Sequence, residues 1–138
     1  MPRVNKELFG SGAPAKTALL GHSLSGLLGV YSLYKTDVFD HVASISGSFW
    51  YQDWAGFVKE NAPVNKKAAV FLSSGEDEGK DAHDIKKNAA LATKDTYKAL
   101  TEHLPQGSIE MQWNPYGHHD HIPLKLSEAL AHLDKQFS

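Results

Sequence analysis

Residues 17–29 read TALLGHSLSGLLG, and the order of apolar and small residues in this stretch decides the fold. The run 17–20 is apolar enough for a buried strand, and apolar residues recur at helical spacing from Leu24 onward. Between the two runs Ser23 lies at the tip of a turn, with Gly21 two residues before it and Ser25 two residues after it. Small residues at both positions allow a strand to turn sharply into a helix and expose a serine, as in a nucleophile elbow. The stretch therefore predicts a strand, an elbow at 21–26 and a helix, with Ser23 as a candidate nucleophile.

The elbow pattern departs from its usual form at one position. Glycine normally stands where this chain has Ser25, and Gly26 follows one residue late. A Gly-x-Ser-x-small string also occurs by chance, in which case Ser23 would be an ordinary turn serine. The strand pattern before it and the helix pattern after it favour the nucleophile.

Length and composition restrict the class of protein. The chain has 138 residues, 41% of them hydrophobic and 22% charged, which is typical of one soluble globular domain spanning 1–138. A net charge of −2 argues against nucleic acid as a partner, and the chain contains no cysteine. No apolar run reaches the ~20 residues of a membrane span, and the first ten residues lack the apolar core of a signal peptide. We expect a cytoplasmic protein that has no contact with membranes. The absence of a Gly-rich phosphate loop argues against a nucleotide-binding α/β domain, and we expect no cofactor.

The rest of the chain alternates strand and helix patterns. Short apolar strands covered by helices indicate a parallel sheet with helices on both faces, whose carboxyl ends carry the ligand chemistry. The expected strands are 17–20, 41–45, 68–72 and 109–113, and the expected helices are 24–34, 53–61 and 85–104. A last helix is expected with Pro123 near its start and with apolar residues at 126, 130, 133 and 137. The strand ends hold, in chain order, a serine, an acidic loop at 75–81 and a histidine loop at 117–121. Serine, acid, histidine is the order of an α/β-hydrolase triad.

Residue types alone leave the partners of Ser23 open. The acid could be any of three neighbours in the acidic loop, Glu76, Asp77 and Glu78, and the loop could equally be a solvated surface segment. The histidine could be His118, His119 or His121. These histidines, with Asp120 and His22, also raise the question of a metal site. We expect none, because adjacent histidines on an irregular loop rarely converge on one ion without further ligands.

Four segments together resemble the putative esterase family of α/β-hydrolases, which includes esterase D, siderophore esterases and feruloyl esterases. GHSLSGLLGVY is similar to the family's elbow and its helix, and SISGSFWY to its next strand end, with Gly47 where proline is usual. SSGEDEG is similar to the family's acid segment, and GHHDHIPLKLSEAL to its histidine segment, with Asp120 where serine is usual. The resemblance runs from about Ala15 to Phe137. It implies a partial α/β-hydrolase fold, with about four mostly parallel strands and helices on both faces.

The resemblance also implies roles for individual residues. It places the nucleophile on Ser23, the general base on His118 and the acid on Glu78, with His121 and Asp77 as alternatives. The backbone N–H of Leu24, directly after the nucleophile, would be one oxyanion donor.

The same resemblance implies hydrolysis of a small carboxylic ester. Aromatic residues after the second strand could form a wall of the substrate pocket, or they could belong to the core. The candidate pocket residues are His22, Phe49, Trp50 and Tyr51.

The family fold begins with several strands ahead of the elbow, and a loop among them supplies the second oxyanion donor. This sequence begins just before the elbow strand, so it resembles only the C-terminal half of the family, as a fragment, a truncated gene product or one piece of a split protein. Losing one oxyanion donor typically costs ~10²–10³ in turnover. An exposed edge at 17–20 invites pairing with another chain. We therefore expect a homodimer or a missing N-terminal partner, and the alternative function is a catalytically impaired remnant acting as an assembly or binding subunit.

Overall fold

The computed structural model describes residues 17–79, 84–115, 118 and 121–137. Strands and helices alternate along these residues in the predicted order. The elements are β1 (Ala18–His22), α2 (Leu24–Ser32), β2 (His41–Ile45), α3 (Trp54–Glu60), β3 (Ala69–Gly75), a 3-10 turn (Ile85–Asn88), α4 (Ala89–His103), β4 (Ile109–Asn114) and α5 (Ile122–Phe137). Parts of the predicted acidic and histidine loops, at 80–81, 117 and 119–120, lie outside the described residues.

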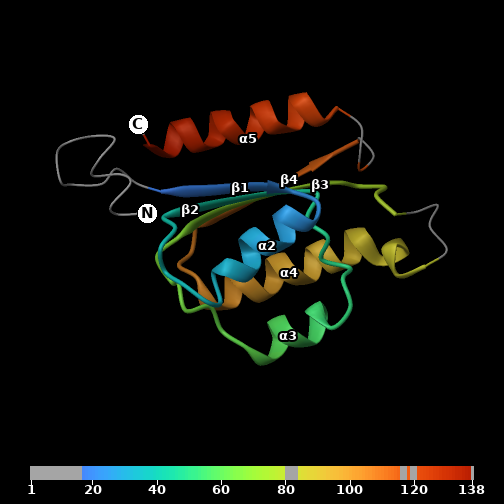
Figure 1. The fold of residues 1–138 in the computed structure, drawn as a ribbon, viewed down its shortest axis with the longest axis horizontal. Helices are drawn as coiled ribbons and strands as arrows, with labels where there is room; N and C mark the ends of the chain where they lie inside the picture. Colours follow the sequence, from blue (N-terminus) through green and yellow to red (C-terminus); the bar gives the residue numbers. More distant parts are fainter. Residues whose placement is uncertain (1–16, 80–83, 116–117, 119–120, 138) are drawn as a thin grey trace.

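The described strands form one parallel sheet in the order β1-β2-β3-β4. Each connection joins two neighbouring strands of the sheet, and right-handed connections of this kind place their helices on the same face. Helices α2, α3 and α4 therefore lie on one face, and α5 covers the other (Figure 1). This arrangement confirms the predicted partial α/β-hydrolase fold with helices on both faces. All strands point the same way, so the turn after β1 and the loops after β2, β3 and β4 meet at one edge of the sheet.

The core lies on both sides of the two central strands. Every residue of β2 is buried, and β3 is buried from Val70 onward. On the side of α2, α3 and α4 the core includes Val30, Leu72 and Leu100, each fully buried, and on the α5 side it includes Ile45 and Phe71. The near-continuous apolar strands follow from this two-sided burial.

The structure differs from the prediction in two places that matter for the site. β1 runs through Gly21 to His22, so the strand ends directly before Ser23. On α5, the apolar spacing predicts an inner stripe that includes Leu130, but Leu130 is 56% exposed, and Lys125 and Ala129 are buried instead. Leu126 and Leu133 of the predicted spacing do pack in the core, so the inner face of α5 lies partly where predicted and also includes a lysine. No helix among the described residues is both long and apolar enough to cross a membrane.

Candidate active site

Ser23 is the only residue between β1 and α2, and its backbone is strained. Its φ is 64° and its ψ is −122°, a region that side-chain-bearing residues rarely adopt. The turn is held by the Ser23 N–H, which donates to the carbonyl of Ile45 at 3.0 Å, and by the Ser48 N–H, which donates to the carbonyl of Ser23 at 3.1 Å. The chain reverses within one residue and leaves the hydroxyl at the end of the strand, as a nucleophile elbow requires.

The departure at Ser25 has a steric explanation. A Cβ on Gly21 would lie 2.3 Å from the carbonyl oxygen of Ser25, and a Cβ on Gly26 would lie 2.7 Å from Ser44 Oγ. The Ser25 side chain itself is exposed. The elbow therefore needs glycine at 21 and 26, where backbones approach each other, and tolerates a side chain at 25.

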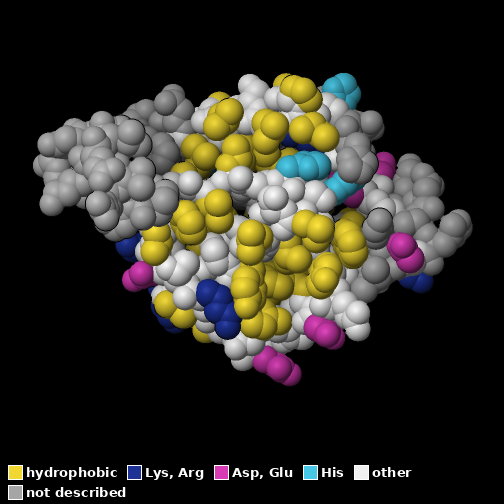
Figure 2. Space-filling model, in the orientation of Figure 1, with side chains coloured by type: hydrophobic (Ala, Val, Ile, Leu, Met, Phe, Trp, Pro, Cys, Tyr) yellow, Lys and Arg dark blue, Asp and Glu magenta, His cyan; other side chains and the backbone are white. Residues whose placement is uncertain are grey.

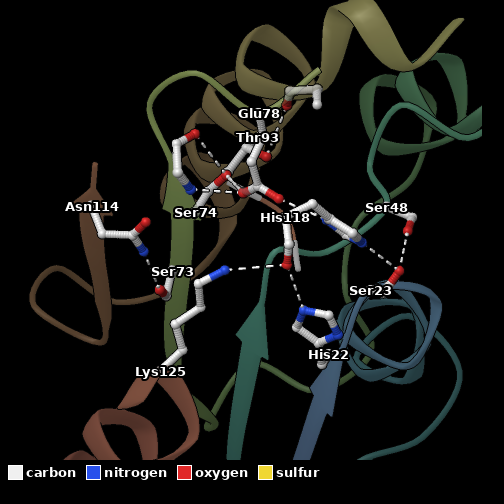
Figure 3. A network of polar contacts seen from close by, with 12 residues as sticks. His22, Ser23, Ser48, Ser73, Ser74, Glu78, Thr93, Asn114, His118 and Lys125 are labelled. Atoms are coloured by element: carbon white, nitrogen blue, oxygen red, sulfur yellow. Dashed lines mark hydrogen bonds and ion pairs between the residues drawn. The ribbon is translucent and has the colours of Figure 1, made fainter. Parts of the chain in front are cut away.

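The structure brings together Ser23, His118 and Glu78 from three separate segments (Figure 3). Ser23 Oγ lies 2.9 Å from His118 Nε2, and His118 Nδ1 lies 2.6 Å from Glu78 Oε1. A carboxylate only accepts hydrogen bonds, so Nδ1 carries the proton and donates it to Glu78. The lone pair of Nε2 is then directed at the Ser23 hydroxyl, which donates to it.

Glu78 is ionised although it is buried. Burial alone would raise the pKa of its carboxyl, but hydrogen bonds from His118, from the Gly75 N–H at 2.6 Å and from Ser74 Oγ at 2.8 Å outweigh burial and lower the pKa to about 2. Only 4% of the Glu78 side chain is exposed. The carboxylate is thus fixed by the turn after β3 and aimed at the imidazole.

The alternative candidates lie elsewhere. Glu76 and Asp77 are both exposed, although each is within two residues of Glu78. His121 is also exposed, and its carbonyl accepts the N–H of Lys125 in the first turn of α5. His119 and Asp120 lie outside the described residues. Within the described part of the chain, no group of three or more His, Asp or Glu side chains is arranged to hold a metal ion.

A hollow of about 370 Å³ opens over the Ser23 hydroxyl. Its lining comes from the segments that carry Ser23, Glu78 and His118, from the loop after β2 and from the start of α4: Ser23, Leu24, Ser46, Gly47, Ser48, Trp50, Ser74, Glu78, Gly79, Ala89 and His118. Leu24 is the first residue of α2, where the backbone N–H has no acceptor within the helix. The hollow therefore combines a candidate nucleophile, a base and a donor for a developing negative charge.

The four predicted pocket residues have different places. Trp50 lines the hollow, and Tyr51 lines a second, apolar groove beside it. Phe49 is 2% exposed and stacks on Trp54 in the core, which is the alternative that the sequence left open. His22 Nε2 lies 3.2 Å from the backbone carbonyl of His118.

Sequence reasoning missed three side chains that contact the candidate residues Ser23, Glu78 and His118. Ser48 Oγ lies 3.3 Å from Ser23 Oγ, Ser74 donates to Glu78, and Lys125 Nζ donates to the His118 carbonyl at 3.2 Å. Ser48 and Ser74 both lie just after predicted strands, and a polar residue at the carboxyl end of a parallel strand is a signal that could have identified them. Lys125 had a weaker one: a charged residue between Leu124 and Leu126 at the start of an otherwise amphipathic helix.

Comparison with known proteins supports one family. The sequence profile of the putative esterase family matches residues 2–122. An uncharacterized protein of Bacillus subtilis (strain 168), YbbA, is 31% identical over 125 residues, which are 90% of this chain and 45% of YbbA.

Solved structures share the fold at low identity. Siderophore hydrolase EstA from Aspergillus nidulans superposes with a TM-score of 0.67 at 19% identity, over 99% of this chain and 54% of that one. Esterase PE8 superposes with a TM-score of 0.60 at 16% identity, over 97% of this chain and 57% of that one. Acyl-protein thioesterase 2 from Zea mays superposes with a TM-score of 0.60 at 13% identity, over 99% of this chain and 63% of that one. The chain spans about half the length of YbbA and EstA.

The profile covers most of the chain, and the described strands and helices follow the α/β-hydrolase order. The protein belongs to the putative esterase family and carries part of the α/β-hydrolase fold.

Proposed function

We propose that this protein is a serine hydrolase that cleaves small carboxylic esters through Ser23, His118 and Glu78. The observation that carries the proposal is the unbroken chain of hydrogen bonds from the Ser23 hydroxyl through the His118 imidazole to the Glu78 carboxylate. The family includes esterases, but the catalytic assignment rests on this geometry.

In the proposed mechanism Ser23 Oγ attacks the ester carbonyl carbon while its proton passes to His118 Nε2. The positive charge that forms on the imidazole is stabilised by Glu78, which is ionised at neutral pH. The Leu24 N–H, at the positive end of the α2 dipole, stabilises the oxyanion. His118 then gives the proton to the departing alcohol. Water, deprotonated by His118, cleaves the acyl-enzyme and restores Ser23.

The size of the hollow limits the substrate. At about 370 Å³ it lies near the lower end of the ~300–1,000 Å³ typical of small-molecule sites. Its serine hydroxyls and the Trp50 ring suit a small ester with a short acyl group and a polar or planar alcohol part. We therefore expect turnover of short-chain aryl esters such as p-nitrophenyl acetate.

A fluorophosphonate probe tests the proposal directly, because it reacts only with an activated serine. We expect intact-mass analysis of wild-type protein to show one adduct, and the Ser23→Ala variant to show none. Ser25→Ala is the matched control, since Ser25 is exposed two residues away, and it should label like wild type. Folded wild-type protein that remains unlabelled would contradict the proposed hydrolase activity.

A second candidate function, as an assembly or binding subunit, is favoured by a separate observation. Hydrophobic side chains gather over α2 and α3 (Figure 2), where Leu24, Leu28 and Tyr51 are 57%, 61% and 52% exposed. They border an apolar groove of about 460 Å³. Among the described strands, β1 is also an edge, paired only with β2. Exposed apolar surface beside an edge strand is typical of a protein–protein contact.

For this candidate we expect a homodimer that buries the groove and the β1 edge. Multi-angle light scattering at micromolar concentration should give twice the chain mass for wild type and the single-chain mass for Leu28→Lys. Leu130→Lys is the control, because Leu130 is as exposed as Leu28 but lies on α5, across the sheet. A monomeric wild type would contradict the dimer.

A further inference from the structure

The backbone carbonyl of His118 accepts hydrogen bonds from two side chains that belong to different elements. Lys125 Nζ, from the first turn of α5, donates at 3.2 Å. His22 Nε2, from the last residue of β1, lies at the same distance and must be the donor, because a carbonyl oxygen only accepts. Both side chains point at this oxygen from below the triad (Figure 3).

The burial of Lys125 indicates that its ammonium group is needed where it lies. The residue is only 1% exposed and is among the largest fully buried side chains of the described structure. Burying a lysine costs free energy unless its polar group is used, and an apolar residue of similar volume would fill the site without that cost. The bond to the His118 carbonyl uses the buried ammonium group and gives one reason for a lysine at this position.

His118 differs from Ser23 and Glu78 in the segment of the chain that carries it. Ser23 is held between β1 and α2, and Glu78 by the turn that follows β3. His118 lies between the end of β4 at Asn114 and the start of α5 at Ile122, outside both elements. A displacement of a catalytic group by about 1 Å can cost 10²-fold in rate. A bond from each side of the carbonyl would prevent such a displacement.

We propose that Lys125 and His22 are positioning residues, which hold the His118 carbonyl and thereby keep the imidazole in line between Ser23 and Glu78. The proposal rests on the function proposed above. It assigns no contact with substrate to either residue. It explains why a lysine is buried beneath the site and why a histidine directly precedes the nucleophile.

The charge state of His22 suits this role. Burial lowers the pKa of His22, and electrostatic repulsion from its neighbours, including Lys125, lowers it further. Its bond to the His118 carbonyl and the charge of Glu78 act in the opposite direction. His22 is therefore neutral at pH 7 and still donates through Nε2. A neutral ring 5.0 Å from the His118 ring adds no second positive charge beside the imidazolium that forms during catalysis.

The test compares variants that remove one donor and keep the shape of the side chain. Lys125→Met should lower kcat for p-nitrophenyl acetate and the rate of fluorophosphonate labelling by about 10²-fold, with KM nearly unchanged. His22→Phe should lower both rates roughly fivefold, because it removes one neutral hydrogen bond, and His22→Gln should restore most of the loss by returning a donor. Lys98→Met, on the exposed side of α4, is the control and should match wild type.

A spectroscopic measurement separates this proposal from the function on which it rests. The proton between His118 Nδ1 and Glu78 should give a low-field NMR resonance in wild type, whether or not the protein turns over an ester. Lys125→Met and His22→Phe should broaden or remove this resonance. Variants that keep the wild-type resonance and the wild-type labelling rate would overturn the positioning role. If wild type has the resonance but does not label, the hydrolase function fails, and the resonance of the variants still decides the positioning role. If Lys125→Met does not fold, the comparison of His22→Phe with His22→Gln tests the positioning role by itself.

Discussion

Replacing Glu78 with glutamine is expected to lower kcat for ester hydrolysis about 10⁴-fold and to leave KM close to the wild-type value. A glutamine fits the same space and can still accept the hydrogen bonds of Ser74 and the Gly75 N–H. Its amide group differs from the carboxylate only in what it presents to His118. The expected loss of kcat therefore comes from a change in which nitrogen of His118 carries the proton, and not from a displacement of the ring.

The physical reason is the tautomer of His118. The Glu78 carboxylate requires a proton on Nδ1 and leaves Nε2 free to accept the proton of Ser23. The amide NH₂ of a glutamine would instead donate to Nδ1 and move the ring proton to Nε2. An Nε2–H facing Ser23 cannot act as a base, and no negative charge remains to stabilise an imidazolium.

The same variant makes a prediction about stability and pH. The pKa of Glu78 falls from 4.5 to about 2 on folding, so the ionised carboxylate stabilises the folded protein. For a lowered pKa, this contribution is complete above the unfolded value and is lost as the pH falls toward the folded value. The difference in unfolding free energy between wild type and Glu78→Gln should therefore be constant near neutral pH and shrink between about pH 4.5 and pH 2.

Steady-state kinetics and urea unfolding check both expectations. Glu76→Gln is the matched control: it makes the same chemical change two residues away on an exposed side chain and should leave kcat unchanged. A Glu78→Gln variant that kept more than a tenth of wild-type kcat would show that Glu78 does not orient the base. A comparable loss of kcat in an Asp77→Asn variant would identify Asp77, and not Glu78, as the acid that orients His118.

The sequence predicted the fold well because local signals agreed with the tertiary structure. Strand 41–45 is buried at every residue, and strand 109–113 alternates apolar and polar residues at the edge of the sheet. Both were found within one residue. Ser23 was predicted from the elbow alone. The edge of the sheet where the site lies followed from the rule that parallel strands present their carboxyl ends together.

The sequence could not choose the partners of Ser23 from residue types. Glu76, Asp77 and Glu78 have the same chemistry, and only the turn that buries Glu78 against the Gly75 N–H separates them. Family resemblance selected Glu78 and His118, and these are the residues that the structure places beside each other. Lys125 was missed because a lysine is rarely fully buried, so the apolar spacing that includes Leu126 and Leu133 gave no reason to place it inside. Leu130 was expected inside and Lys125 was not, and the fold places them the other way round.

Replacing Gly21 with alanine is the second change for which we expect a large effect, on stability. The new Cβ would lie 2.3 Å from the carbonyl oxygen and 2.4 Å from the carbonyl carbon of Ser25, and 2.8 Å from the nitrogen of Gly26. All three atoms belong to the backbone, so no side chain can rotate away to make room. Overpacking a core usually costs about 1–3 kcal/mol, and this site should exceed that range because β1 and α2 must separate.

Urea unfolding measures the loss, and Gly56→Ala is the matched control. Gly56 lies within α3, a Cβ there meets no atom within 4 Å, and alanine should stabilise the helix by about 0.5–1 kcal/mol. The two variants add the same methyl group and should shift stability in opposite directions. Any Gly21→Ala protein that folds should also label more slowly with the fluorophosphonate, since Ser23 can keep its φ of 64° only if the elbow stays closed. Equal stability and equal labelling in Gly21→Ala and wild type would mean that the elbow is not under steric constraint, and the departure at Ser25 would then need another explanation.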